Sequence, residues 1–524
     1  MRRALLCCAL IALAAGACSS SSATPTPYNQ AANAPAAPAA SYAAAATAAP
    51  AWHGATPYPI ATPYSWSTPG SDGVPFPSMN TNPYVDTTED HLSTFGLDVD
   101  TASYTVARGA IAQGRRPETS TIRPEEWVNY FDQGYAAPET DTFAIHVDGA
   151  PTPFLTSGEV LLRVGVKGRA VSAGRRPSAA LTFVVDCSGS MADQNKLEMV
   201  KGSLALLANE MRSDDRIAIV AFSTEARVVL GPTSGSDQWA IMNAISSLRP
   251  GDSTNAEDGL RLGYQLGRQQ FIEGGINRVV LATDGVANVG YTDAATILQH
   301  AGIDAASSHV QLVAIGVGMG DYNDSLLEDL ADKGEGFYAY VDTADEAKRI
   351  FVDKLTTTID TIALDAKAQI DFNPQMVAGY RLIGYEDRGV PDASFRSNSS
   401  KGGAIGAGHQ VTALYALVLR SSESQDQRLA TVTLRWTDPT THRATEIASD
   451  VNRGDLAPTF AQSDPHFKLD SLVAATAETL RSSPWIPGYR IRDLQSAADE
   501  IRHSLPETKE ATDFLQMLDQ VRNW

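Results

Sequence analysis

An unbroken apolar run that breaks into alternating oxygen-bearing residues constrains this chain more than any other stretch. The run is Leu181-Thr-Phe-Val-Val, followed by Asp186-Cys-Ser-Gly-Ser-Met191. A continuous apolar segment of this length is typical of a strand buried on both faces of a parallel sheet. Ligands of such sheets bind outside the carboxyl ends of the strands. We therefore expect Asp186, Ser188 and Ser190 to converge on one ligand, for which a hard divalent cation is the natural choice.

Two further segments continue this pattern downstream. They are Gly251-Asp-Ser-Thr-Asn255 and Asn277-Arg-Val-Val-Leu-Ala-Thr-Asp284, the second being another apolar run that ends in an aspartate. The order of the three segments resembles the metal-ion-dependent adhesion site (MIDAS) of von Willebrand factor A (vWA) domains. The resemblance implies a bound Mg²⁺, with Mn²⁺ or Ca²⁺ as alternatives, and a protein ligand that supplies a Glu or Asp carboxylate. The metal ligands that it implies are Asp186, Ser188, Ser190, Thr254 and Asp284.

The types of these five side chains limit what the site can do. Two carboxylates and three neutral hydroxyl oxygens leave a divalent cation electrophilic and with an open coordination position, which suits Mg²⁺ because this ion tends to keep water ligands. The ordinary alternative is that these residues only cap helices and turn loops, as Asp after a strand and Ser before a helix often do. The order of all five favours metal binding. Asp252 either adds a ligand or only turns its loop.

A nucleophilic enzyme is a different interpretation of the same loop. Cys187, Ser188 or Ser190 would need a general base within hydrogen-bonding reach, whereas a bound Mg²⁺ could itself activate water. No histidine lies near these segments in the sequence, and nothing else supplies a base. The isolated histidines are His300, His309 and His409. We therefore expect no catalytic residues and no enzyme activity, and we expect Cys187 to pack as a small apolar residue.

The N-terminus predicts export and a membrane anchor. Residues 1–18 have a positive start, a short apolar core and small residues before Cys18, which are the parts of a signal peptide. Ala15-Gly-Ala-Cys18 resembles a bacterial lipobox, in which the cysteine is lipidated after cleavage, although Ala15 stands where leucine is usual. An ordinary secretory signal is the alternative. We expect a lipid-anchored protein of the cell membrane that faces the extracytoplasmic side, in the periplasm or at the cell surface.

Composition excludes one class of partner and predicts a spacer. The formal net charge is -20, whereas a nucleic-acid-binding surface needs a basic face. Residues 19–93 are dominated by Ala, Pro, Ser and Thr and lack an apolar period, so we expect a disordered tether. Of the four cysteines, Cys187 would remain alone in the mature globular part, which excludes an internal disulfide there.

Segments on both sides of the vWA motifs extend the resemblance. They are Leu97-Asp-Val-Asp-Thr-Ala-Ser-Tyr104, Arg123-Pro-Glu-Glu-Trp-Val-Asn-Tyr-Phe131, Ile383-Gly-Tyr-Glu386 and Gly406-Ala-Gly-His-Gln-Val-Thr-Ala-Leu-Tyr415. With the vWA motifs between them, they resemble the bacterial YfbK-like lipoproteins, in which a family-specific N-terminal segment precedes a vWA domain and a C-terminal domain. Within the first segment, Asp98 and Asp100 are either metal ligands or strand and cap residues. The local pattern favours Asp100 as the N-cap of a helix over Thr101–Gln113.

Periodicity predicts three kinds of structure in turn. Alternating strands and helices predict an α/β domain with a doubly wound, mostly parallel sheet and helices on both faces. Alternating apolar stretches between turn-forming clusters then predict a β-sandwich, and helical periods follow. The predicted divisions are residues 94–177 (N-terminal family segment), 178–358 (vWA domain), 359–460 (β-sandwich region) and 461–524 (C-terminal helices). Strands over Asp141–Asp148 and Val160–Gly168 would complete the sandwich, so we expect the vWA domain to be inserted in it or flanked by it.

The function that these patterns favour is binding rather than catalysis. We expect a membrane-anchored extracytoplasmic protein that binds a protein ligand through a MIDAS, with a carboxylate of the ligand completing the metal shell. The alternative is a structural or assembly component of the cell envelope, in which the metal mainly stabilises the vWA domain. A metal-dependent hydrolase is the third interpretation.

Overall fold

The computed structural model describes the chain from residue 81 onward, with short gaps. The described residues are 81–97, 99–171, 176–284, 293–300, 309–318, 324–353, 360–397, 402–421, 427–486, 490–521 and 524. The predicted signal peptide, the lipidation site Cys18 and most of the predicted tether lie outside these residues, as does Asp98. The chain divides into two units, Met1–Gly54 and Ala55–Trp524, and all described residues belong to the second.

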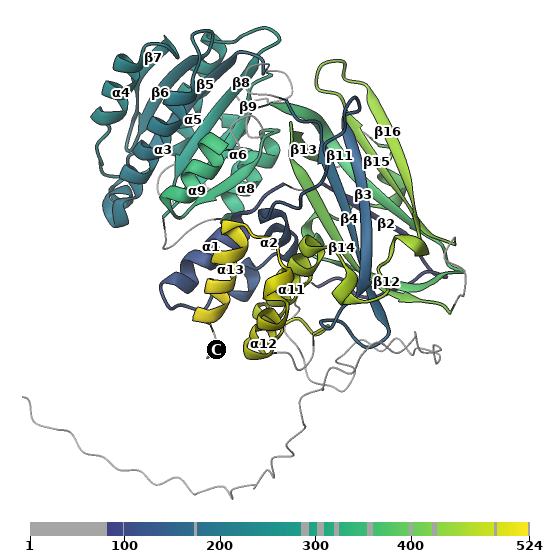
Figure 1. Cartoon of the computed structure of the whole chain (residues 1–524). Coiled ribbons are helices and arrows are strands. Elements are labelled where there is room, and N and C mark those ends of the chain that lie inside the picture. Colours follow the sequence, from purple (N-terminus) through teal and green to yellow (C-terminus); the bar gives the residue numbers. More distant parts are fainter. Residues whose placement is uncertain are drawn as a thin grey trace, which may run out of the picture. The chain divides into compact units, whose positions relative to one another are not determined.

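A mostly parallel sheet forms the middle of the chain (Figure 1). Its strand order is β10-β9-β8-β5-β6-β7, in which β7 runs antiparallel to β6 and the other neighbours run parallel. The strands are β5 (Ala179–Asp186), β6 (Arg216–Phe222), β7 (Ala226–Ser234), β8 (Ile276–Thr283), β9 (Gln311–Val317) and β10 (Tyr338–Val341). The helices are α3 (Lys196–Glu210), α4 (Gln238–Ser247), α5 (Ala256–Gln269), α6 (Ala294–His300), α8 (Asp324–Lys333) and α9 (Ala344–Lys348), and a π-helical turn follows α9 (Arg349–Asp353).

Both faces of this sheet are covered by helices, which confirms the predicted doubly wound α/β fold. Alternate residues of β5 point to opposite faces. Phe183 and Val185 join an apolar cluster with α3, α4 and α9, whereas Val184 joins a cluster with α5, α6 and α8. All eight residues of β5 are buried, so the apolar run is the central strand of the domain.

A β-sandwich is built from strands on both sides of the vWA domain in the sequence. One sheet has the order β1-β12-β14-β4-β3, and the other contains β13-β11-β15-β16, with β2 also paired to β11. The first sheet consists of β1 (Val85–Asp86), β12 (Val377–Ile383), β14 (Gln410–Leu419), β4 (Glu159–Gly168) and β3 (Phe143–Pro151). The second consists of β13 (Gly403–Gly406), β11 (Thr361–Phe372), β15 (Arg428–Thr437), β16 (Ala444–Asn452) and β2 (Leu92–Gly96). Because β4 precedes the vWA domain and pairs with β14 after it, the vWA domain is inserted in the sandwich.

The ordered part of the chain begins earlier than the sequence predicted. The tether was expected to reach residue 93, but Val85 pairs with Tyr380 of β12, and Leu92 pairs with Asp371 of β11. Phe95 is then buried in the sandwich core. The prediction was wrong here because these few apolar residues form no local period, and their partners lie far away in the sequence.

Asp100 has a different role from the predicted one. The helix α1 (Ala102–Ala112) has Thr101 as its N-cap, and the first-turn N–H of Ser103 donates to the Glu126 carboxylate at 2.7 Å rather than to Asp100. Instead, the buried Asp100 carboxylate accepts a hydrogen bond from the backbone N–H of Tyr338 at 3.1 Å and receives Arg388 at 3.4 Å. Asp100 therefore ties the N-terminal segment to β10 of the vWA domain.

The N-terminal and C-terminal helices share one core. These helices are α1, α2 (Pro124–Tyr130), α11 (Pro465–Leu480), α12 (Ile491–Ile501) and α13 (Lys509–Gln520). Tyr104 and Trp127 pack in this core with Phe131 and Phe514, and the rings of Tyr104 and Trp127 meet edge to face with centroids 5.3 Å apart. The helical regions before and after the vWA domain therefore form a single layer beside the sandwich strand β14, which contacts α2.

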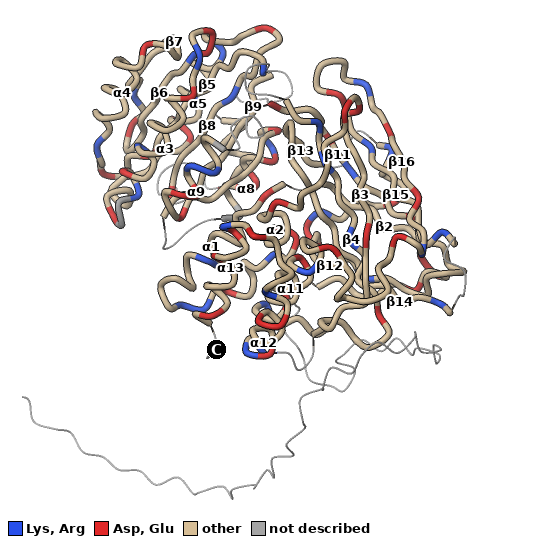
Figure 2. The backbone as a smooth tube through the Cα atoms, viewed as in Figure 1, with Lys and Arg blue, Asp and Glu red and all other residues tan. Residues whose placement is uncertain are grey.

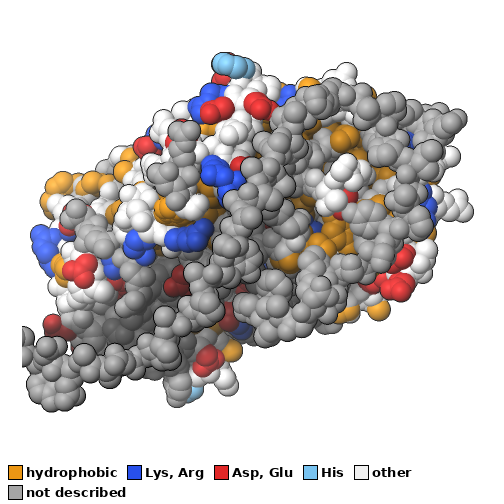
Figure 3. Space-filling model, turned by 90° about the horizontal axis from the view of Figure 1, so that it is seen from below, with side chains coloured by type: hydrophobic (Ala, Val, Ile, Leu, Met, Phe, Trp, Pro, Cys, Tyr) orange, Lys and Arg blue, Asp and Glu red, His pale blue; other side chains and the backbone are white. Residues whose placement is uncertain are grey.

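Charged residues of both signs are distributed along the vWA domain and the sandwich (Figure 2). On the face seen in Figure 3, basic, acidic and apolar side chains of the described residues are interspersed. Within the described parts of the chain, no helix is long and apolar enough to cross a membrane.

Truncation of Trp127 tests the shared helical core. Trp127 has 0% of its surface exposed, so Trp127→Ala should lower the free energy of unfolding by about 3–5 kcal/mol. Trp239 is 79% exposed, and Trp239→Ala is the matched control, which should change this free energy by less than about 0.5 kcal/mol. Urea unfolding followed by circular dichroism measures both. Equal effects of the two substitutions would contradict the assigned core.

Candidate metal site

The predicted ligands lie at the carboxyl edge of the vWA sheet, where the strand order reverses. The chain enters the sheet at its centre with β5, continues to β6 and β7 on one side, and returns to β8 on the other. Asp186 ends β5, and Asp284 directly follows β8. Such a reversal separates the loops that leave the two strands and creates a crevice for ligands. The sheet topology therefore explains why the site forms at this point.

Backbone hydrogen bonds join the first two predicted metal loops. The N–H of Gly189 donates to the carbonyl of Asp252 at 2.9 Å, and the N–H of Gly251 donates to the carbonyl of Cys187 at 2.5 Å. A Cβ atom on Gly189 would lie 3.2 Å from the Asp252 carbonyl, and one on Gly251 would lie 2.9 Å from Oγ of Ser223. The two glycines therefore allow the close approach that brings the Thr254 loop to the Asp186 loop.

The first loop holds its oxygens in a fixed arrangement. Oδ1 of Asp186 accepts the N–H of Ser188 at 2.8 Å, and Oδ2 accepts the hydroxyl of Thr283 at 2.6 Å. The hydroxyl oxygens of Ser188 and Ser190 lie 3.1 Å apart. These contacts hold carboxylate and hydroxyl oxygens together through bonds within the chain itself, which lowers the ordering entropy that cation binding would cost.

Two buried oxygens of the site have no hydrogen-bond partner among the described residues. They are Oγ1 of Thr254 and Oδ1 of Asp284, and both residues are at least 95% buried. An unsatisfied buried polar atom costs about 1–3 kcal/mol, and a hard cation would satisfy both atoms. Among the described residues no group of three His, Cys, Asp or Glu side chains could hold a metal. A cation here would therefore depend on the hydroxyl oxygens as well as on the two carboxylates.

A lysine that the sequence did not single out lies in the site. Nζ of Lys196 lies 3.0 Å from Oδ2 of Asp284, and both side chains are buried. A Cβ atom on Gly318 would lie 2.4 to 2.6 Å from three carbons of the Lys196 side chain, so this glycine makes room for the lysine. Lys196 and Asp284 are 88 residues apart, so no local pattern predicts this contact. The one sign in the sequence is that Lys196 stands at the start of α3.

Burial raises the pKa of Asp186 to about 6, and the nearby negative charge of Asp284 acts in the same direction. Hydrogen bonds from Thr283 and Ser188 oppose this rise. Two close carboxylates in a buried site favour a proton or a cation. The site thus has the electrostatics of a cation site, with Lys196 neutralising one of its two negative charges.

The remaining predicted positions have minor roles. Burial raises the pKa of the Cys187 thiol to about 11, whereas a catalytic thiol has a lowered pKa. Cys187 packs in the apolar cluster beneath α3. Asp252 is exposed and contributes its backbone carbonyl to Gly189.

Comparisons with known proteins match the three parts of the described chain. A family model described as von Willebrand factor type A domain matches residues 180–353, and one described as von Willebrand factor matches residues 72–163. The model of the C-terminal part of the uncharacterized protein YfbK matches residues 357–523. The uncharacterized protein YfbK of Escherichia coli is 33% identical over 469 residues, which cover 85% of this chain and 80% of that protein. The chain belongs to the YfbK family.

Other similar proteins share smaller parts of their sequence with this chain or have lower identity. The YfbK-family chain is 31% identical to the uncharacterized protein sll0103 of Synechocystis over 39% of this chain and 46% of that protein. It is 28% identical to human inter-alpha-trypsin inhibitor heavy chain H4 over a stretch that covers 29% of this chain and 17% of that protein. A solved von Willebrand factor type A protein from Catenulispora acidiphila covers 74% of this chain and 91% of its own, with 16% identity and a TM-score of 0.43. vWA domains are generally protein-interaction modules rather than enzymes.

The pH dependence of stability tests the buried carboxylate. The folded-state pKa of Asp186 is raised to about 6 from 3.8, so its stabilising contribution is full well below pH 3.8 and is lost as pH rises through and beyond 6. In chelator, the free energy of unfolding should fall by about 3 kcal/mol from this group over that interval. Urea unfolding of the protein and of Asp186→Asn, which lacks this titration, measures the difference. A difference that does not change with pH would contradict the assignment.

Replacement of Lys196 tests its role in the site. Lys196→Met leaves Asp284 buried without its cation, so the chelated variant should lose about 3 kcal/mol of stability. Mg²⁺ should then bind more tightly than to the unsubstituted protein, because the two carboxylates no longer share an ammonium group. Calorimetric titration with Mg²⁺ and thermal unfolding measure both effects. Lys201→Met in the same helix is the control and should change neither quantity. Weaker Mg²⁺ binding by Lys196→Met would contradict the prediction.

Proposed function

We propose that this protein binds a protein ligand through a divalent cation at the candidate site, and that a carboxylate of the ligand completes the metal shell. The observation that carries the proposal is the pair of buried oxygens without a partner, Thr254 Oγ1 and Asp284 Oδ1. They lie beside a preformed arrangement of oxygens around Asp186. Membership of a family with a vWA domain supports an interaction role.

The residues of the candidate site would have two roles, cation binding and control of the net charge. Asp186, Ser188, Ser190, Thr254 and Asp284 would hold the cation, and Mg²⁺ fits these oxygen donors. When bound, the cation supplies an electrophilic centre for a carboxylate of the ligand. Lys196 would keep the net charge of the site low, so that the cation retains affinity for an additional negative ligand.

We further propose that the protein is anchored to a membrane on its extracytoplasmic side. The signal-peptide pattern of residues 1–18 and the lipobox-like end at Cys18 support export and lipidation. The low-complexity segment that follows would act as a spacer between the anchor and the folded unit. Cys18 and residues 19–80 lie outside the described residues, so this part of the proposal rests on the sequence.

Thr254→Val tests the metal site without disturbing the fold. This substitution exchanges a buried hydroxyl without a partner for a methyl group of similar size, so the chelated variant should be as stable as the unsubstituted protein or more stable. The affinity for Mg²⁺ should fall by about tenfold or more, because one oxygen ligand is lost. Calorimetric titration and thermal unfolding measure the two quantities. Thr476→Val, at a buried threonine of α11, is the matched control and should leave Mg²⁺ affinity unchanged.

A capture experiment tests the function itself. The immobilised protein is incubated with envelope extract in Mg²⁺ and in chelator, and the captured proteins are compared by mass spectrometry. Some proteins should be captured in Mg²⁺ but not in chelator. Thr254→Val and the double variant Asp186→Ala with Ser188→Ala should fail to capture these proteins. Capture that survives chelation and the double variant would refute the metal-bridged mechanism and favour a structural role in envelope assembly.

A further inference from the structure

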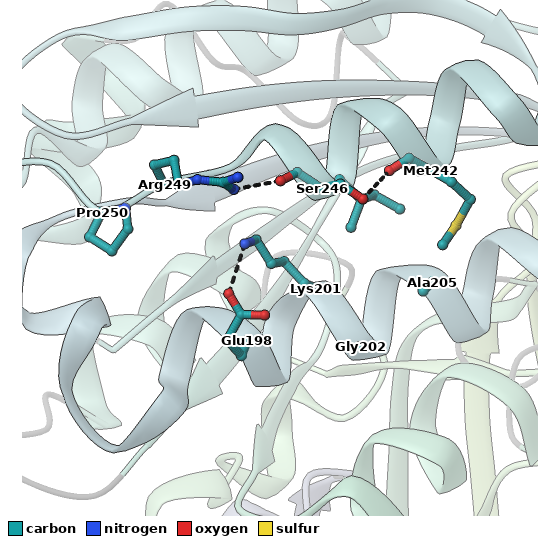
Figure 4. A pocket seen from close by; sticks show the side chains of 9 residues that line it. Glu198, Lys201, Gly202, Ala205, Met242, Ser246, Arg249 and Pro250 are labelled. Carbon is teal, nitrogen blue, oxygen red and sulfur yellow. Dashed lines mark hydrogen bonds and ion pairs between the residues drawn. The ribbon is translucent and has the colours of Figure 1, made fainter. Parts of the chain in front are cut away.

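A groove of about 570 Å³ runs between α3 and α4 (Figure 4). Both of its walls begin at the predicted metal loops. The helix α3 follows the loop that carries Ser188 and Ser190, and α4 leads through Arg249 and Pro250 into the loop that carries Thr254. A ligand segment that reaches the cation can therefore continue along this groove.

The α4 wall of the groove contains the exposed side chain of Met242. Among the described residues, the large apolar side chains classed as exposed are Val228, Trp239 and Met242, all in the segment that forms β7 and α4. Trp239, Met242 and Ser246 are spaced i, i+3 and i+7, so they share one face of the helix. Exposed apolar side chains that gather in one place mark interaction sites.

Gly202, on the α3 wall, has no side chain to fill the groove. It lies in the interior of α3, where glycine destabilises a helix relative to alanine. Apart from its chain neighbours and the backbone of its own helix, no heavy atom of the described chain lies within 4 Å of the position that its Cβ would occupy, and its φ angle is not positive. Nothing within the fold therefore requires a glycine here, and the free space belongs to the groove.

Two basic side chains face this groove from opposite walls. Lys201 reaches from α3 towards the end of α4 that carries Arg249 (Figure 4) and pairs with Glu198 at 2.7 Å. The Arg249 guanidinium donates to the backbone carbonyls of Ser246 and Leu248 at 2.5 and 2.7 Å. Among the described residues no carboxylate pairs with Arg249. On a chain with a net charge of -20, this end of the groove suits an acidic ligand.

We propose that the α3–α4 groove is the second contact site of the protein ligand, and that the ligand segment is acidic and apolar. One carboxylate of the segment completes the metal shell, an apolar side chain lies over Gly202 against Met242, and a second acidic side chain pairs with Arg249. Trp239 covers the far end of the segment. This inference rests on the proposed metal-bridged function and specifies which ligands that function selects.

Selection of peptides tests the proposal without a known partner. A random 12-residue peptide library displayed on phage is selected on the purified protein in Mg²⁺. Enriched peptides should combine Asp or Glu with an aliphatic or aromatic residue and should be released by chelator. Synthetic copies, followed by fluorescence polarisation, should bind Gly202→Leu and Arg249→Gln at least about tenfold more weakly than the unsubstituted protein.

Controls separate the groove from the metal site. Gly202→Ala and Gly202→Leu should both raise the melting temperature, because alanine and leucine favour the helix over glycine. With the melting temperature of each variant measured, a loss of peptide binding can be told from a loss of folding. Metal-dependent peptides that bind Gly202→Leu and Arg249→Gln with unchanged affinity would overturn the groove while leaving the metal-bridged function intact. Peptides that need Gly202 but bind equally in chelator and to Thr254→Val would instead overturn the metal-bridged function. A selection that enriches no peptide with both acidic and apolar residues would also overturn the groove proposal.

Discussion

The antiparallel pairing of β4 with β14 is the constraint on which the rest of the architecture depends. It joins strands on either side of the vWA domain over a register that runs from Glu159 opposite Val418 to Lys167 opposite Gln410. Arg278, near the start of β8, donates to the hydroxyl of Thr361 on the sandwich strand β11. Since β5 has eight residues and spans about 26 Å, the carboxyl ends of the strands lie well beyond this contact. The contact with the sandwich and the candidate metal site therefore lie towards opposite ends of the central strands.

Buried charge connects the fold with the proposed function. Asp186 and Asp284 are both buried at the end of the central strands, and Lys196 offsets one of their charges. Isolated charges are costly in a protein interior, so this edge of the sheet is a place where an additional cation is favourable. The same loops end or begin the helices that form the groove, which is why metal binding and recognition of a ligand segment can act on one partner.

Local sequence signals identified the main elements of the site, but not all of its contacts. Asp186, Ser188, Ser190, Thr254 and Asp284 follow apolar strands or precede helices, and this order could be found from residue type and spacing. The roles of Thr283 and Lys196 were not predicted, because their partners are far away in the sequence. Thr283 is 97 residues from Asp186, and Lys196 is 88 residues from Asp284. Asp100 was misassigned as a helix cap for the same reason, since its partners Tyr338 and Arg388 come from distant strands and loops.

The sequence by itself determined the α/β class, the doubly wound sheet, the helical C-terminus and the family, because burial periodicity and motif order are properties of neighbouring residues. The tertiary structure alone decided which strands close the sandwich, where the ordered chain begins, and how Lys196 enters the metal site. It also decided that α3 and α4 leave a groove over Gly202. These features depend on contacts between residues far apart in the chain, whose free energy is set by packing and burial that no local pattern records.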